Sequence, residues 1–192
     1  MTFWVLSSRN DGAVLDAYPE GPDGWRYLEP QPLAHEFRAG AVMGFSPSFP
    51  DRRKTYDFVT NVLGLQVVSE RVRRVVSELA PQDAEFLPVT LVDHNKDVVS
   101  REHFIMNLLH RREAIDLEHS DVVMSSILKT EIQFVHGLAL KRDHPSDGSH
   151  VFRPVHLRSH AFVDVTLREA LVQAGLKGCR FLAAHGWDGD ED

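Results

Sequence analysis

The sequence predicts an α+β domain with a mixed, mostly antiparallel sheet and two main amphipathic helices. Two segments, residues 70–79 and 165–174, have apolar residues at helical spacing. Short apolar segments between turn-forming residues fill most of the remaining chain, which is typical of strands. A length of 192 residues, with 43% hydrophobic and 26% charged residues, suits one domain. We expect this single domain to span residues 1–187, followed by an acidic tail at 188–192.

The first 60 residues are expected to form short strands separated by turns. Residues 3–6 and 25–28 are predicted to be strands, with a turn at the Asn-Asp-Gly sequence of residues 10–12. Residues 40–50 contain two glycines and two prolines, too many for a helix or a central strand. We therefore predict an ordered irregular segment there, because its phenylalanines and methionine need to be buried.

The clearest regular element is the helix at residues 70–79. Ser69 is a good N-cap, Val72 and Val76 lie on one face of the helix, and Pro81 ends it. Residues 85–92, 104–109, 132–140 and 151–152 are rich in strand-forming residues, and a turn is expected at 93–97. With residues 141–150 as a polar loop, about eight strands accompany the two helices.

An internal similarity appears when the chain is shifted by 95 residues without a gap. The shift aligns Val68 with Val163, Ser69 with Asp164, Val72 with Leu167, Arg73 with Arg168, Val76 with Leu171, and Phe86-Leu87 with Phe181-Leu182. Each copy is predicted to contain a strand end, a capped amphipathic helix, a turn and a strand. This pattern is either a true internal repeat or the general likeness of any two capped helix-to-strand units.

No catalytic, metal-binding or cofactor-binding motif is assembled in the sequence. His156 and His160 have the i, i+4 spacing of a helical zinc site, but no glutamate lies between them to act as a general base. Cys179 has only Arg180 beside it, so a small buried side chain is the favoured interpretation over a nucleophile. Glycine-rich phosphate loops and the Gly-x-Ser-x-Gly motif are absent. We therefore predict no cofactor, no metal and no catalytic residues.

The charge of the chain is acidic and concentrated at one end. The net charge is −7, and four carboxylates lie in the last five residues. This balance disfavours direct binding to nucleic acid and suits a basic partner. A single cysteine indicates a reducing compartment, and neither a signal peptide nor a membrane span is recognisable, so we expect a cytoplasmic protein.

Packing and turn motifs run through residues 55–183. They include Val-Ser-Glu-Arg before the first helix (68–71), Phe-Leu-Pro-Val in the next strand (86–89), and Ile-Asp followed by Ser at 115–120. In these motifs the chain resembles the bacterial polymorphic-toxin immunity proteins of the myxobacterial type, a family formerly catalogued as a domain of unknown function. The resemblance implies a non-enzymatic antidote that binds and occludes a cognate toxin, a nuclease in many cases, in competition or kin discrimination between bacteria.

A nuclease must present cations to phosphate, so a negatively charged antidote would be steered toward it. The residues expected to face the toxin are Asp116, Glu118, Asp188, Asp190, Glu191 and Asp192. Asp116 and Ser120 have an alternative role, since Asp116 could accept backbone N–H groups in a structural turn. The alternative function is a metal-dependent hydrolase or another small enzyme that uses the region of His156 and His160.

Overall fold

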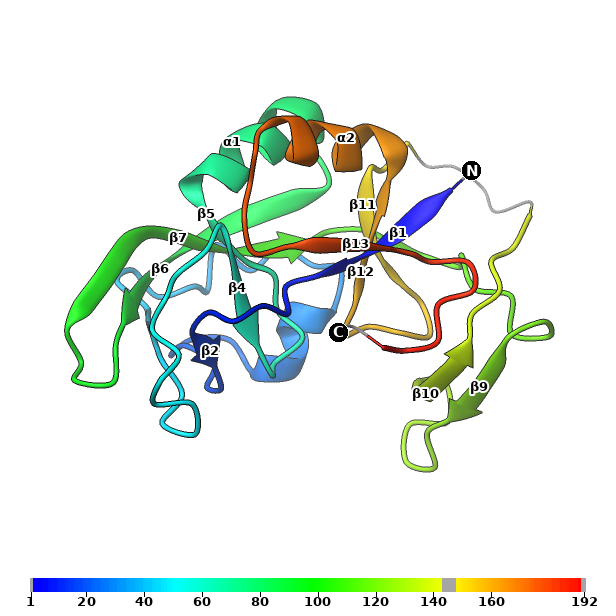
Figure 1. The fold of residues 1–192 in the computed structure, drawn as a ribbon, viewed down its shortest axis with the longest axis horizontal. Coiled ribbons are helices and arrows are strands. Elements are labelled where there is room, and N and C mark those ends of the chain that lie inside the picture. The colour runs from blue at the N-terminus through cyan, green and yellow to red at the C-terminus, as the bar shows by residue number, and fades with distance from the viewer. Residues whose placement is uncertain (1, 143–147, 191–192) are drawn as a thin grey trace.

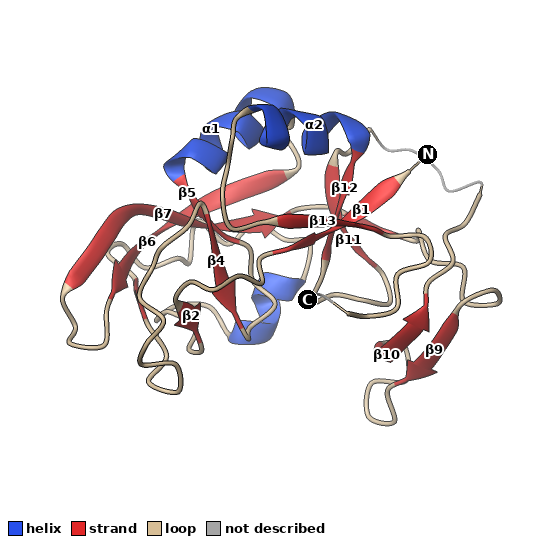
Figure 2. Ribbon diagram, in the orientation of Figure 1, coloured by secondary structure: helices blue, strands red, loops and turns tan. Residues whose placement is uncertain are grey.

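The computed structural model describes residues 2–142 and 148–190 (Figures 1 and 2). This part of the chain contains two α-helices, α1 (Glu70–Leu79) and α2 (Val165–Gln173), and one 3-10 helix, η1 (Gly24–Leu28). Its strands are β1 (Phe3–Ser7), β2 (Val14–Leu15), β3 (Val42–Gly44), β4 (Phe58–Asn61), β5 (Val67–Ser69), β6 (Ala84–Val92), β7 (Val98–Leu108), β8 (Arg111–Arg112), β9 (Asp121–Met124), β10 (Ile132–Gly137), β11 (Val151–Pro154), β12 (Ala161–Asp164) and β13 (Arg180–Ala183).

The strands form two larger sheets and one separate hairpin. The first sheet has the order β2-β4-β5-β7-β6-β3, the second has the order β13-β1-β12-β11-β8, and β9 pairs only with β10. Most pairs are antiparallel; the three parallel pairs are β2 with β4, β3 with β6, and β8 with β11. The α+β class and the mostly antiparallel pairing are as the sequence predicts.

Each larger sheet contains the same strand–helix–strand unit. In the first unit, β5 leads into α1 and then β6, and the antiparallel strand β7 lies between β5 and β6. In the second unit, β12 leads into α2 and then β13, and β1 lies between them in the same way. A further antiparallel strand joins each unit at the corresponding edge, β4 beside β5 and β11 beside β12. The internal similarity in the sequence therefore coincides with a repeated topology.

The similarity extends to the side chains that hold each helix on its sheet. Arg73 lies over the ring of Phe104, with its guanidinium carbon 5.5 Å from the ring centroid. Arg168, 95 residues later, lies 4.8 Å from the centroid of the Trp4 ring. The two rings occupy equivalent positions, because Phe104 pairs with Val68 and Trp4 pairs with Val163. Both units thus use an arginine on an aromatic ring, an arrangement favoured by the ring quadrupole.

The molecule has three layers, with both helices on one face of the sheets (Figure 2). The first core cluster lies between helices and sheets and contains Val72 and Leu167, equivalent residues of the two helices. On the opposite face, residues 13–45 cover the first sheet and build a second cluster around Tyr27. Residues 114–138, together with Trp187, cover the second sheet and build a third cluster around Phe162. Each sheet is therefore buried on both faces.

Two predictions for the N-terminal segment need correction. The prediction of a strand at residues 25–28 is wrong, because η1 forms there, with Arg26 N–H donating to the Asp23 carbonyl. This segment pairs with no strand, and Tyr27 is fully buried while Trp25 is exposed. Residues 40–50 are mostly irregular as expected, but Val42–Gly44 forms β3, an edge strand parallel to β6.

Other element boundaries differ moderately from the predictions. Both helices begin at the predicted residues, and α2 ends one residue earlier than expected. The predicted strand at residues 104–109 is longer and begins at Val98, while that at 132–140 ends at Gly137. The described residues contain thirteen strands instead of about eight, because two- to four-residue strands carry too few residues to show an alternating pattern.

Candidate functional site

The β9–β10 hairpin projects from the side of the second sheet (Figure 1). One of its faces, with Val122, Met124, Ile132 and Val135, packs into the third core cluster. The connecting turn is ordered by Ser125, whose N–H donates to the Glu131 carbonyl and whose Oγ accepts from the N–H of Leu128. The inner face is therefore anchored while the outer face is presented to solvent.

The hairpin exposes a group of large apolar residues to solvent. It exposes four residues, which we call the apolar hairpin surface: Val123, Ile127, Leu128 and Phe134. Val123 and Phe134 are paired across the two strands, and Ile127 and Leu128 occupy the turn. Ile127 is 88% exposed and Phe134 is 56% exposed, unusual values for side chains of this size. Exposed apolar side chains grouped on one element are typical of protein–protein interaction sites.

The turn at residues 155–160 fastens the hairpin to the body. Ile132 N–H donates to the His156 carbonyl, and the His156 Nδ1 lies 2.7 Å from the Thr130 carbonyl oxygen. Arg158 forms an ion pair with Glu131 of the hairpin turn at 2.7 Å. The hairpin is thus held in one orientation by backbone and side-chain contacts, which lowers the entropy cost of using it to bind a partner.

Asp116 and Glu118 lie in the turn that leads into β9. Asp116 Oδ1 accepts hydrogen bonds from the backbone N–H groups of Glu118 and His119, and Oδ2 lies 2.9 Å from the His119 ring nitrogen. Desolvation alone would raise the pKa of Asp116, but the contacts from His119 outweigh it and lower the pKa below its ordinary value. Asp116 therefore has the structural role of the alternative interpretation, whereas Glu118 is exposed.

The described part of the acidic tail lies beside the same hairpin. Leu138 N–H donates to the Trp187 carbonyl, whereas the Ala139 carbonyl accepts from Asp116 N–H. In an extended segment, the backbone N–H and C=O groups of successive residues point to opposite sides. The turn with Asp116 and Glu118 therefore lies on one side of residues 138–139, and the tail with Asp188 and Asp190 lies on the other. Asp188 and Asp190 are exposed there, and Gly189, at φ +89°, lies so close to the Val135 carbonyl that a Cβ would clash. Glu191 and Asp192 lie outside the described residues.

His156 and His160 do not form a helical metal site. They lie in two consecutive turns rather than in a helix, and the His160 ring packs edge-on against the Trp187 ring, with centroids 5.1 Å apart. Nowhere within residues 2–142 and 148–190 do three or more His, Cys, Asp or Glu side chains gather in a metal-binding group. The two histidines instead make separate contacts, His156 with the Thr130 carbonyl and His160 with the Trp187 ring.

Two other groups with catalytic side chains lack a catalytic arrangement. Ser69 Oγ donates to Asp57 Oδ1 at 2.7 Å, but the His103 ring contacts Ser100 Oγ and the Tyr56 carbonyl instead of Ser69. The His103 imidazole is therefore not positioned to activate the Ser69 hydroxyl. Burial, together with the nearby Asp57 carboxylate, raises the pKa of Cys179 to about 11, which keeps its thiol protonated at neutral pH.

The sequence analysis missed the apolar hairpin surface, although a signal was present. Ile127 and Leu128 stand in a stretch of serines, lysine and threonine that is otherwise typical of a turn. Two large apolar residues in such a turn indicate either burial or an interaction surface, and only the fold distinguishes the two.

Comparison with known proteins supports the earlier resemblance. None of the curated proteins matches the chain. Within the described residues, neither α1 nor α2 is long and apolar enough to cross a membrane. A family model described as Immunity protein family (Imm11) matches residues 7–186, which include both strand–helix–strand units and the hairpin. The chain therefore belongs to the Imm11 immunity protein family.

Proposed function

We propose that this immunity protein acts without catalysis, by binding a cognate toxin through the apolar hairpin surface and covering the toxin's functional site. The observation that carries the proposal is the exposed group of Val123, Ile127, Leu128 and Phe134 on an anchored hairpin. Exposure of such a group to water is unfavourable. A partner that covers it gains about 25 cal/mol of free energy for each Å² of apolar surface removed from water. Family membership identifies a toxin as the partner that fits an immunity protein.

The acidic residues beside the hairpin favour a basic toxin. Glu118, Asp188 and Asp190 are exposed on the two sides of residues 138–139, which directly follow β10 of the hairpin. An apolar centre with a charged rim is the usual organisation of a protein interface. A nuclease needs cationic groups to hold phosphate, so we propose a nuclease as the toxin and the cytoplasm as the place of neutralisation. The rim carboxylates would accelerate the encounter.

We expect the gene for this protein to lie beside a larger gene that encodes a toxin domain, and the direct test is co-purification of the two products. We expect a stoichiometric complex and loss of toxicity when both are produced together. The double variant Ile127→Ser with Phe134→Ser should abolish both effects while leaving the melting temperature unchanged. The control, Val98→Ser with Val172→Ser, removes two exposed valines remote from the hairpin and should remain protective.

Two results would contradict this proposal. If the adjacent toxin domain kills cells equally with and without the protein, and the two form no complex, the immunity mechanism is wrong. If the complex forms with full affinity in the hairpin variant, binding occurs through another surface. Zinc bound by the purified protein and lost in His156→Ala with His160→Ala would instead favour a hydrolase.

A further inference from the structure

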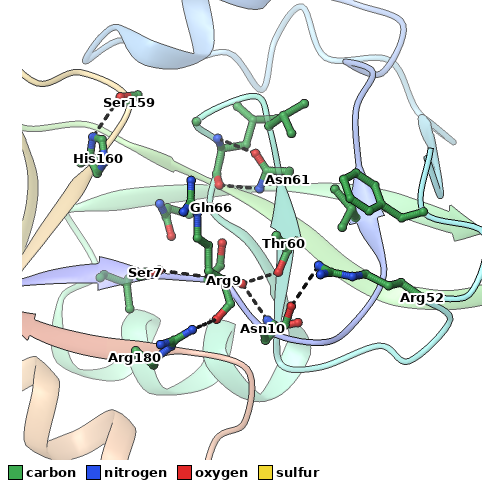
Figure 3. A pocket seen from close by; sticks show the side chains of 17 residues that line it. Ser7, Arg9, Asn10, Arg52, Thr60, Asn61, Gln66, Ser159, His160 and Arg180 are labelled. Carbon is green, nitrogen blue, oxygen red and sulfur yellow. Dashed lines mark hydrogen bonds between the residues drawn. The ribbon is translucent and has the colours of Figure 1, made fainter. Parts of the chain in front are cut away.

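A pocket of about 570 Å³ lies where the two units meet (Figure 3). Its walls come from the end of β1 and the following loop, the turn between β4 and β5, the turn before β12, and the first residue of β13. The volume is within the range of small-molecule sites, about 300–1,000 Å³, and such sites commonly form between structural units.

The lining of this pocket is basic in an acidic protein. Arg9, Arg52, Arg180 and His160 contribute to its walls, and no aspartate or glutamate does so among the described residues. The chain as a whole has a net charge of −7. The pocket lining thus has the opposite charge to the chain as a whole, and a positively charged lining favours an anionic ligand.

Two of these arginines are held in place through one hydrogen bond each. Arg52 donates from one Nη to the Asn10 carbonyl and lies 5.2 Å from the centroid of the Phe49 ring. Arg180 donates from one Nη to the carbonyl of Arg9, the residue before Asn10. Neither guanidinium forms an ion pair with a carboxylate in the described chain. Each therefore keeps four further N–H donors, in the planar geometry that suits phosphate and carboxylate.

Gln66 adds a buried polar group without a partner. The residue is 95% buried, it lines the pocket (Figure 3), and its carboxamide oxygen has no hydrogen-bond partner. By contrast, Asn61 in the same wall accepts two backbone N–H groups and donates to the carbonyls of Val59 and Leu65. A buried acceptor without a donor loses its hydration and gains no hydrogen bond in return, which is unfavourable. A ligand with an N–H group would supply the missing donor.

We propose that this pocket binds a small anionic molecule of up to mononucleotide size, whose phosphate or carboxylate contacts Arg52 and Arg180 and whose N–H donor contacts Gln66. The charge of the pocket argues against the toxin as its occupant, because the carboxylates beside the hairpin favour a basic partner. The inference goes beyond the immunity role, since the ligand binds the isolated protein.

The test is isothermal titration calorimetry of the full chain alone with adenosine and guanosine monophosphate, inorganic phosphate, and citrate. We compare the wild type with Arg52→Gln combined with Arg180→Gln, and separately with Gln66→Leu. The matched control, Arg101→Gln with Arg142→Gln, removes the same charge from two exposed arginines outside the pocket. We expect the arginine variant to lose at least about tenfold in affinity, as for charge-assisted hydrogen bonds, and the control to bind as the wild type does.

The probes distinguish the two sources of the oxyanion. Binding of the phosphate probes alone assigns a phosphate ligand, and binding of citrate alone assigns a carboxylate ligand. A weaker effect of Gln66→Leu on inorganic phosphate than on the nucleotides supports the assignment of the N–H donor to Gln66. The proposal is overturned if none of the probes binds at millimolar concentration, or if the control loses as much affinity as the pocket variant. It is also overturned if Arg52→Gln with Arg180→Gln weakens the toxin complex but leaves the binding of the small-molecule probes unchanged.

Discussion

The two strand–helix–strand units share one topology and one set of helix-to-sheet contacts, but different segments cover their outer faces. Residues 13–45 lie over the first sheet and bury Tyr27 and Leu33 completely. Residues 114–138 lie over the second sheet and contain the β9–β10 hairpin. Only one face of this hairpin is buried against the sheet, and Phe134 and Ile127 remain exposed. The repeated units thus provide a stable scaffold, whereas the covering segments differ in what they present to a partner.

The units also differ at the start of their helices. Asp164 caps α2, since its Oδ1 accepts from Leu167 N–H. Ser69, at the equivalent position before α1, makes no such bond and donates its hydroxyl to Asp57. The strand partner differs too, because His103 pairs with Ser69 where Phe3 pairs with Asp164. Equivalent positions therefore have different polar contacts within the same topology.

The largest effect on stability is expected in the scaffold. Leu167→Ala removes a fully buried side chain under α2 and should lower the free energy of unfolding by about 2–5 kcal/mol. Leu128→Ala, in the hairpin turn, removes a half-exposed side chain and should change it by about 0.5 kcal/mol or less. Urea unfolding of both variants measures the difference. Equal losses would show that the hairpin is part of the cooperative core.

The next largest effect is expected in toxin affinity, when a substitution in one covering segment is compared with a substitution in the other. Phe134→Ala should weaken the complex by about 2 kcal/mol or more, as for an interface residue that carries much of the binding energy. Trp25→Ala removes a side chain of 60% exposure from the segment over the first sheet and should leave the affinity unchanged. Surface plasmon resonance with the toxin domain measures both. A larger loss for Trp25→Ala would place the interface on the opposite half of the molecule.

Exchange of the residues at the two N-cap positions, Ser69 and Asp164, should change stability by unequal amounts. Ser69→Asp places a second carboxylate beside Asp57 and should destabilise the protein by about 1–3 kcal/mol. Asp164→Ser retains a competent N-cap and should cost less than about 1 kcal/mol, despite loss of the contact with His150. Thermal unfolding under identical conditions provides the comparison. Similar losses in both variants would mean that the two helix starts are equivalent after all.

The smallest effect is the pH dependence contributed by His103. Burial lowers the pKa of His103 below its unfolded value of about 6.5, despite contacts that favour the charged form. As the pH falls through 6.5, the unfolded chain therefore binds a proton that the folded protein excludes, and stability decreases. His103→Gln should show a shallower decrease in urea midpoint between pH 7.5 and 5.5. An unchanged pH profile would contradict this assignment.

Local patterns predicted the helices well because the information lies within the helix itself. The spacing of Val72 and Val76, with Ser69 before them and Pro81 after them, requires no knowledge of distant residues. The strand prediction at residues 25–28 failed because those residues have no strand beside them. For the site, the sequence predicted Glu118, Asp188 and Asp190 from their charge, and this stays a prediction. Asp116, predicted with them, orders its own turn.

The sequence by itself determined the α+β class and the two helices, because periodicity and capping are local properties of the chain. The 95-residue similarity left a true repeat and a general likeness open, and the strand pairing showed the repeated topology. Tertiary structure decided which apolar residues remain exposed and which basic ones surround a pocket. Those outcomes depend on pairing between distant segments, as when residues 3–7 enter between residues 161–164 and 180–183. Ile127 and Phe134 become a surface only because Ile132 and Val135 beside them are buried by the second sheet.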